Sequence, residues 1–225
     1  MRDCASIIPY LASLAAAAFA LVFGVERLLR KSTLAYFQFL IWGAACFALA
    51  SLSAFVNYVC GSTDNLHVTL ASCGIIGVLI AFLCANMGVL DKLVDEKNDS
   101  TRKARRIAFV TPVVFAAALG VACVRNLEEG RGNFSLLIIA LGVPMVLGSY
   151  YNTKHLLLPM DGMQILKMTR GCNIMCLLFD AAEVVYMTAS AYEKPIVTDV
   201  CCVVRSLIVL VLIVFAVRGS KEWSL

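Results

Sequence analysis

Hydrophobic residues occupy seven stretches of this 225-residue chain, and each stretch is long enough to cross a lipid bilayer. A membrane-spanning α-helix needs about 20 mostly apolar residues. No segment alternates apolar and polar residues with the period of two typical of a membrane β-barrel. Because backbone amides in hydrocarbon must be paired within the protein, continuous apolar runs become helices. The pattern predicts an all-α polytopic membrane protein, a single domain over residues 1–225 with seven transmembrane helices at about 5–28, 34–59, 67–90, 106–124, 134–152, 171–191 and 196–217.

The composition agrees with this pattern. Hydrophobic residues make up 61% of the chain, charged residues make up 15%, and the mean hydropathy is +0.86. Soluble domains carry about 25% charged residues, so we expect the lipid bilayer to be the solvent of this chain. The formal net charge of +4 comes from loop residues that membrane topology accounts for, and no nucleic-acid partner is expected.

Lysine and arginine are distributed unequally between alternate loops. The segments after the first, third, fifth and seventh stretches hold 14 of the 19 basic residues, and one more, Arg205, lies inside the last stretch. Short cytoplasmic loops keep an excess of lysine and arginine. The distribution therefore predicts an outward N-terminus and a cytoplasmic C-terminus, in the plasma membrane.

The start of the chain has an alternative interpretation. The residues MRD, followed by an alanine-rich run that ends near residue 20, have the layout of a cleavable signal peptide. Cleavage would place Arg27, Arg30 and Lys31 on the outer face, against the charge rule. We therefore expect the first helix to be retained.

Charged residues also occur inside the sixth and seventh spans. The sixth span contains Asp180 and Glu183, and the seventh contains Asp199 and Arg205. A charge at the centre of a spanning helix costs about 2.5 to 3.5 kcal/mol, so such residues face the bundle interior and find partners. With a rise of about 1.5 Å per residue, Asp180, Glu183 and Arg205 reach similar depths. The sequence thus predicts a polar site between the sixth and seventh helices.

The charges in this predicted site do not balance. Arg205 has a planar fork that is able to bridge Asp180 and Glu183, but three carboxylates then accompany one guanidinium. An excess of negative charge is unfavourable in the low-dielectric interior, although Asp199 lies only about 5 Å below the surface, where it can stay hydrated. The excess negative charge predicts that one carboxyl keeps its proton, that a cation is bound, or that a ligand amine or hydroxyl completes the site. The alternative is an ion pair that only fixes helix register.

Helical spacing extends the predicted site along one face of the sixth helix. Steps of three or four residues place five side chains on that face: Asn173, Cys176, Asp180, Glu183 and Met187.

Other helices contribute further candidates and bends. Asn86 in the third helix is included in the predicted site, and Asn57 and Thr111 are further candidates, although interhelical hydrogen bonds explain such residues equally well. Pro112 and Pro144 are expected to bend the fourth and fifth helices.

Cofactors, metals and catalytic residues are not expected. The two histidines, His67 and His155, fall on opposite membrane faces and cannot jointly bind a haem, and no lysine within a span is available for a retinal Schiff base. The ten cysteines form no CxxC pair or zinc pattern, although a disulfide among Cys4, Cys60 and Cys123 is an alternative to free thiols. Because GxSxG, HExxH, Walker and GxGxxG motifs are also lacking, we expect no enzyme activity.

The loop over residues 91–106 is the main cytoplasmic feature. Its first half is acidic and its second half is basic. The basic half is suited to anionic lipid headgroups, and the loop is also a candidate docking site for a cytoplasmic protein.

Three classes of function remain open. The first is a receptor-like sensor or partner subunit in signal transduction, which binds a small ligand or cation at the site between the sixth and seventh helices. The second is a small-solute or proton-coupled transporter that uses the same acidic residues. Because the two halves of the chain show little of the matching of broken helices that repeat-built transporters have, we rank the sensor first. The third is a structural membrane subunit with a buried ion pair.

Overall fold

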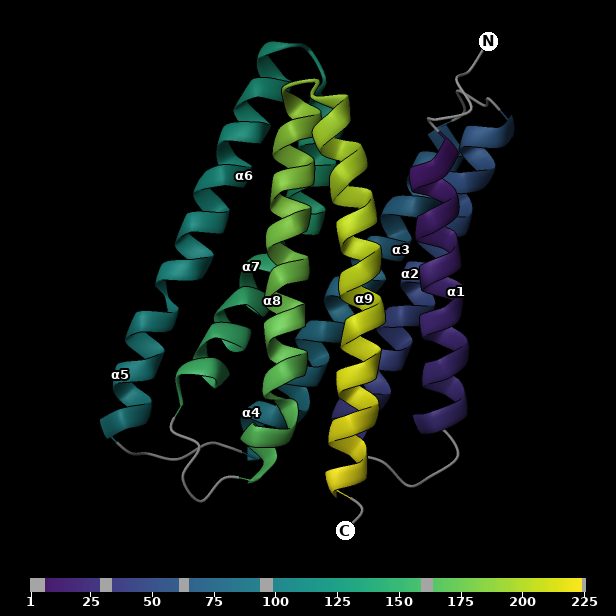
Figure 1. Ribbon diagram of the computed structural model, residues 1–225. Coiled ribbons are helices and arrows are strands. Elements are labelled where there is room, and N and C mark those ends of the chain that lie inside the picture. Colours follow the sequence, from purple (N-terminus) through teal and green to yellow (C-terminus); the bar gives the residue numbers. More distant parts are fainter. Residues whose placement is uncertain (1–6, 29–33, 61–64, 94–98, 159–163, 224–225) are drawn as a thin grey trace.

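The computed structural model describes residues 7–28, 34–60, 65–93, 99–158 and 164–223 (Figure 1). The elements in this part of the chain are helical, and their bounds are α1 (Ile8–Leu28), α2 (Ala35–Cys60), α3 (Asn65–Leu83), η2 (Cys84–Leu90), α4 (Asp91–Leu93), α5 (Asp99–Ala108), α6 (Val110–Glu128), α7 (Gly132–Leu157), α8 (Gln164–Ala191) and α9 (Pro195–Trp223).

Seven spans in the described residues are long and apolar enough to cross a membrane, which confirms the predicted fold class. They contain 20 to 28 residues each, with α3 and η2 forming the third span and α5 and α6 the fourth. The fourth span, Thr101–Glu128, begins five residues earlier than the sequence pattern predicted, because the basic second half of the 91–106 loop is itself helical. The protein is therefore a multi-pass integral membrane protein.

The prolines affect their helices differently. The fourth span is interrupted at Phe109, between α5 and α6, three residues before Pro112. Proline has no N–H and its ring crowds the carbonyl four residues earlier, which is that of Ala108, the last residue of α5. Helix α7, by contrast, continues through Pro144 without interruption.

The third span ends in a π-helical segment, η2. Its widened turn closes with a hydrogen bond from the backbone N–H of Asp91 to the carbonyl of Asn86, five residues earlier. π-Helical turns are rare and often occur at functional sites. The sequence pattern gave no sign of this irregularity.

The helices form a bundle with two sides. In Figure 1, α1, α2 and α3 stand on one side and α6, α7 and α8 on the other, with α9 between α8 and α1 and with the start of α1 and the end of α9 at opposite ends. Helix α9 packs against α8, α1 and α2, and α7 packs against α3, α6 and α8. We call the end at which α1 begins the N-terminal end; it is uppermost in Figure 1.

Apolar side chains cover the outside of the bundle. Trp42, for example, is 65% exposed on the surface of α2. The interior, by contrast, holds several fully buried polar residues together with the aromatic core. This distribution is what a bundle surrounded by hydrocarbon requires.

Helices α2 and α3 approach closely at two glycines. A methyl group on Gly74 would lie 2.7 Å from the Cβ of Ala50 and 2.8 Å from the carbonyl oxygen of Cys46, and one on Gly77 would lie 2.7 Å from the Cys46 sulfur. Small residues permit such close packing of membrane helices. This seam keeps α2 and α3 together as one wall of the bundle.

The cysteines in the described part of the chain are free thiols, including Cys60 and Cys123. Cys4, the third member of the predicted disulfide set, lies outside the described residues. Cys60 is exposed at the end of α2, which reaches the N-terminal end of the bundle.

The position of Cys60 permits a test of orientation. If the N-terminal end faces outward, as the distribution of basic residues predicts, an impermeant maleimide added to intact cells will modify Cys60. The measurement is mass spectrometry of the labelled peptide, with permeabilised cells as the control. Labelling that appears only after permeabilisation would place this end in the cytoplasm.

Candidate functional site

A cavity of about 490 Å³ lies in the half of the bundle nearest the N-terminal end. Residues of α1, α2, α3, α6, α7, α8 and α9 line it, so we call it the central cavity. One part of its lining is polar and includes Tyr10, Ser51, Asn57, Glu183 and Arg205. Another part is apolar and includes Phe47, Ile75, Phe134, Leu141 and Met187.

A buried ion pair forms part of the cavity wall. The Arg205 guanidinium donates through Nη1 to the Glu183 carboxylate, and both side chains are less than a tenth exposed. The guanidinium carbon lies 4.2 Å from the centre of the Tyr186 ring, and Nη2 lies 3.2 Å from the Cys202 sulfur. The aromatic face adds a cation–π attraction to the ion pair. These contacts join α8 to α9, the two helices between which the sequence placed the site.

Asp180 does not take part in the predicted bridge to Arg205, which contacts Glu183 instead. It is 1% exposed and accepts a hydrogen bond of 3.3 Å from the Asn152 amide of α7. Among the described residues it makes no ion pair, since Arg205 is directed to Glu183. Asp180 and Glu183 are one helical turn apart, and only Glu183 lines the central cavity.

The predicted face of α8 is buried along its length. All five residues on it are less than a tenth exposed: Asn173, Cys176, Asp180, Glu183 and Met187. Asn173 accepts a hydrogen bond of 2.7 Å from the Tyr36 hydroxyl of α2. The helical periodicity of the sequence thus identified which side of α8 faces the interior.

The remaining sequence candidates are spread over the bundle. Asp199 is half-buried in the second turn of α9 and is not paired with Arg205. Asn57 lines the central cavity, and its buried Oδ1 has no hydrogen-bond partner among the described residues. Thr111 accepts a 3.1 Å hydrogen bond from the Thr153 hydroxyl of α7. Asn86 belongs to a second polar cluster, described below.

Three serines join α1, α2 and α9 beside the cavity. The Ser206 hydroxyl lies 2.8 Å from that of Ser13, which in turn lies 3.1 Å from that of Ser51. All three are buried.

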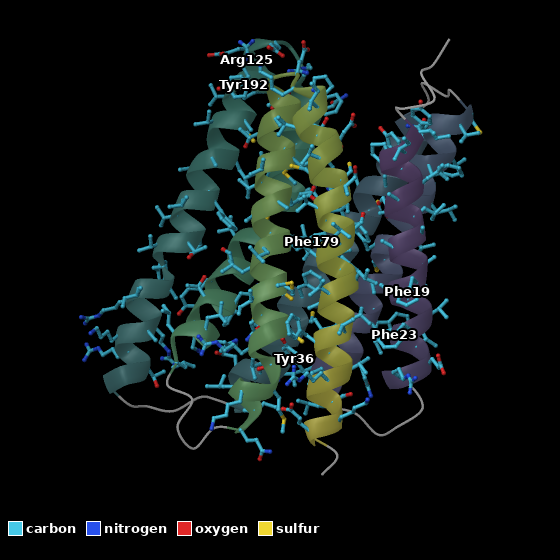
Figure 2. All side chains as sticks on the ribbon, in the orientation of Figure 1. Phe19, Phe23, Tyr36, Arg125, Phe179 and Tyr192 are labelled. Carbon is cyan, nitrogen blue, oxygen red and sulfur yellow. The ribbon has the colours of Figure 1, made fainter. Side chains whose placement is uncertain are left out.

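Deeper in the bundle, Phe179 makes edge contacts with Phe47 and Phe82, at ring-centre distances of 5.8 and 5.5 Å. Figure 2 shows Phe179 about halfway along the bundle. Of these serines and aromatic residues, Ser13, Ser51 and Phe47 line the central cavity.

One edge of the cavity mouth is held by Arg131, in the turn between α6 and α7. Its guanidinium contacts Glu129, donates to the carbonyl oxygen of Ala191 at 2.9 Å, and lies 3.5 Å from Glu193. Glu193 belongs to the turn between α8 and α9. Arg131 therefore ties the two turns together at the N-terminal end, where Figure 2 also shows Arg125 beside Tyr192.

A second polar cluster, the Asp91 cluster, lies in the opposite half of the bundle and consists of Asn86, Asp91, Lys154 and His155. Asp91 forms an ion pair with Lys154 and lies 3.3 Å from Nε2 of His155. Nδ1 of His155 lies 3.0 Å from Oδ1 of Asn86. The cluster links η2 and α4 to the last turn of α7.

The electrostatics of the cluster depend on Asp91. Its partial burial alone would raise the pKa of the carboxyl, but hydrogen bonds and charge attraction from His155 and Lys154 outweigh burial and lower this pKa from 3.8 to about 2. Lys154 is 3% exposed, so its ammonium depends on the Asp91 carboxylate for compensation.

The sequence pattern did not predict this cluster, because Lys154 and His155 follow the predicted end of the fifth span at residue 152 and Asp91 begins the predicted loop. A weak signal was present, since both Lys154 and His155 follow Asn152 within one turn and Asp91 follows Asn86 by five residues. The described residues bring no group of three or more histidine, cysteine or acidic side chains together as metal ligands.

The ion pair can be tested by a double-mutant cycle of Arg205→Gln and Glu183→Gln. Each single change leaves one buried charge without its partner and is expected to lower the free energy of unfolding by about 3 to 5 kcal/mol. The double change is expected to cost less than the sum of the two. Thermal or chemical unfolding in detergent measures these differences. Asp180→Asn combined with Arg205→Gln serves as the control, and coupling there as large as for Glu183 would contradict this pairing.

The Asp91 cluster makes stability depend on pH. Because the pKa of Asp91 in the folded protein lies below its value in the unfolded chain, the ionised carboxylate stabilises the fold fully above about pH 4, and this stabilisation is lost as the pH falls toward 2. The free energy of unfolding falls by roughly 2 kcal/mol as a result. Asp91→Asn is expected to remove this pH dependence and, at pH 7, to destabilise the protein by about 3 to 5 kcal/mol because Lys154 loses its partner. Unfolding curves of both proteins between pH 2 and 7 measure this, and parallel curves would contradict the assignment.

Comparison of the chain with protein-family models, with curated proteins and with solved structures finds no match. The function therefore has to be inferred from the site itself.

Proposed function

We propose that this membrane protein is a receptor-like sensor, or the ligand-binding partner subunit of one, and that it binds a small amphipathic molecule in the central cavity. The observation that carries the proposal is a cavity with a buried ion pair on one wall and apolar side chains on another. Small-molecule sites commonly occupy about 300 to 1,000 Å³ and combine a mainly apolar lining with a few polar groups. The central cavity, at about 490 Å³, meets both criteria.

The lining indicates the chemistry of the ligand. The charges of Arg205 and Glu183 compensate each other, so the site favours a polar group that both donates and accepts hydrogen bonds over a strongly charged one. Asn57 offers a buried amide oxygen without a partner, which a ligand hydroxyl or amine would satisfy. The apolar wall around Phe47 and Met187 would receive a hydrocarbon portion.

The contacts beside the cavity favour binding over passage. The hydrogen bonds of Ser13 with Ser51 and Ser206, and the ring contacts of Phe179 with Phe47 and Phe82, join helices beside the cavity. A transporter of small solutes, the second candidate, would have to break these contacts in each cycle. A purely structural role would leave the unpartnered Asn57 oxygen unexplained.

The proposed sensor would act in the plasma membrane with its cavity facing outward. A signal would then pass to a cytoplasmic protein at the 91–106 segment, where α5 carries Arg102, Lys103, Arg105 and Arg106. In this role the protein performs no catalysis and uses no cofactor.

Thermal unfolding with a panel of small amphipathic metabolites tests the proposal. A ligand that binds the folded state raises the melting temperature by mass action. We expect at least one such compound to stabilise the wild type, and we expect Asn57→Ala to lose that shift while keeping its own stability in the absence of ligand.

Two variants complete this experiment. Arg205→Gln should also lose the shift, whereas Arg218→Gln should retain it, because Arg218 is 77% exposed at the far end of α9. A shift that survives in both cavity variants would place the ligand elsewhere. If no compound stabilises any variant, the receptor proposal fails and the ion pair is structural. Flux assays in vesicles distinguish a sensor from a carrier.

A further inference from the structure

An apolar groove lies between α6 and α7 on the outside of the bundle. It has a volume of about 400 Å³, and apolar residues and one cysteine line it. We call it the α6–α7 groove, and the exposed residues along it are Ala116, Gly120, Ile139, Val143 and Leu147. A methyl group on Gly120 would meet no atom of the described residues within 4 Å. The groove is therefore open to the hydrocarbon that surrounds the bundle.

The helix before α6 carries a concentration of positive charge. Helix α5 contains four basic residues and one acidic residue, Asp99. All four basic side chains are exposed: Arg102, Lys103, Arg105 and Arg106. Ala104 and Ala108 are buried, so the basic residues point away from the bundle. In Figure 2, nitrogen-tipped side chains extend from this helix into the space outside the bundle.

Helical spacing places two of these charges in line with the groove. Steps of three or four residues put five side chains on one face of the fourth span: Arg102, Arg105, Phe109, Val113 and Ala116. The interruption between α5 and α6 does not disturb this face, because Phe109 keeps right-handed helical dihedral angles, with φ −66° and ψ −18°.

Contacts with α7 show that this face turns toward the groove, since α7 forms the other wall. Arg105 lies near enough to Tyr150 and Tyr151 to act on both electrostatically. The ring of Phe109 makes an edge contact with Tyr150, with 5.2 Å between the ring centres. Aromatic residues gather at the headgroup level of membrane proteins. The order along the protein is therefore basic residues, aromatic rings and then the apolar groove.

The length of this path matches half of a bilayer. Ala116, at the near end of the groove, lies eleven residues beyond Arg105, or roughly 16 Å along the helix axis. Half of the hydrocarbon core measures about 15 Å. Phe109 and Val113, each 61% exposed, continue the apolar surface between the two. A phospholipid with its headgroup at Arg105 therefore has an acyl chain long enough to reach the groove.

We propose that the basic side of α5 and the α6–α7 groove together bind one anionic phospholipid. The headgroup phosphate pairs with Arg102 and Arg105, whose planar guanidinium groups match phosphate oxygens. An acyl chain lies along Phe109 and Val113 and ends in the groove. Clusters of four or more basic residues beside a membrane span are typical of segments that bind anionic lipids.

A second copy of the chain fits this surface less well than a lipid does. Copies in one membrane share one orientation, so a symmetric contact through the groove would place both α5 helices at the same depth. Their basic residues would then lie near each other, and the juxtaposition of like charges is unfavourable. An anionic headgroup supplies the opposite charge at that depth.

This site goes beyond the proposed receptor function and does not rest on it. Ile138 lines both the groove and the central cavity, so a bound lipid lies behind one wall of that cavity. Helix α5 is also where the proposed function places a cytoplasmic protein. The lipid and that protein compete for the same basic side chains.

Native mass spectrometry of the purified protein tests the site, with phosphatidylglycerol and phosphatidylcholine of equal chain length added in turn. We expect one phosphatidylglycerol to bind at concentrations at which phosphatidylcholine does not. Arg102→Gln combined with Arg105→Gln is expected to weaken this binding about 30-fold. The control, Lys167→Gln combined with Arg218→Gln, removes two exposed basic residues at the same end of the bundle and leaves binding unchanged.

A second pair of variants tests the groove without altering charge. Gly120→Leu fills the groove and is expected to weaken phosphatidylglycerol binding severalfold. Ala117→Leu is the matched control, because Ala117 is exposed on α6 but does not line the groove, and it leaves binding unchanged.

Several outcomes would overturn the proposal. If the wild type binds both lipids equally, the site is not selective for anionic lipid, and no variant is needed to show this. Binding that Gly120→Leu leaves intact would place the acyl chain elsewhere. A mass of two copies that is lost in Gly120→Leu would assign the groove to a second copy of the chain. Loss of metabolite-induced stabilisation with lipid binding intact would concern the proposed receptor function instead.

Discussion

The interior of this bundle is governed by one constraint, which is that hydrocarbon offers no hydrogen bonds. Every polar group placed there must find its partner inside the protein. Arg205 finds Glu183 and the face of Tyr186, Lys154 finds Asp91, and Tyr36 finds Asn173. These pairs join α8 to α9, α7 to α4 and α2 to α8. The same requirement makes the few unsatisfied atoms, such as the Asn57 oxygen, informative about what the protein binds.

The two polar regions occupy opposite halves of the bundle and have different properties. The central cavity has a compensated ion pair and room for a molecule, whereas the side chains of the Asp91 cluster contact one another. Between them stand the ring of Phe179 and the Asp180 carboxyl, adjacent residues on α8. One turn of this helix separates Glu183, which lines the cavity, from Asp180, which does not.

Hydrophobic length alone predicted the seven spans, since bilayer thickness imposes a strong condition on sequence. Helical periodicity also placed Asp180 and Glu183 on the buried side of α8. Depth along a helix axis, however, does not determine which of two carboxylates an arginine reaches, so the partner of Asp180 was not foreseen. Nor was η2, because π-helical turns depend on packing between helices and leave no periodic pattern. The Asp91 cluster depends on that turn for the position of Asn86.

The link made by Arg131 has a mechanical consequence. By joining the turn between α6 and α7 to the turn between α8 and α9, it ties together four helix ends beside the cavity. The close approach at Gly74 and Gly77 likewise holds α2 against α3. A widening of the cavity would therefore have to separate groups of helices rather than displace a single one.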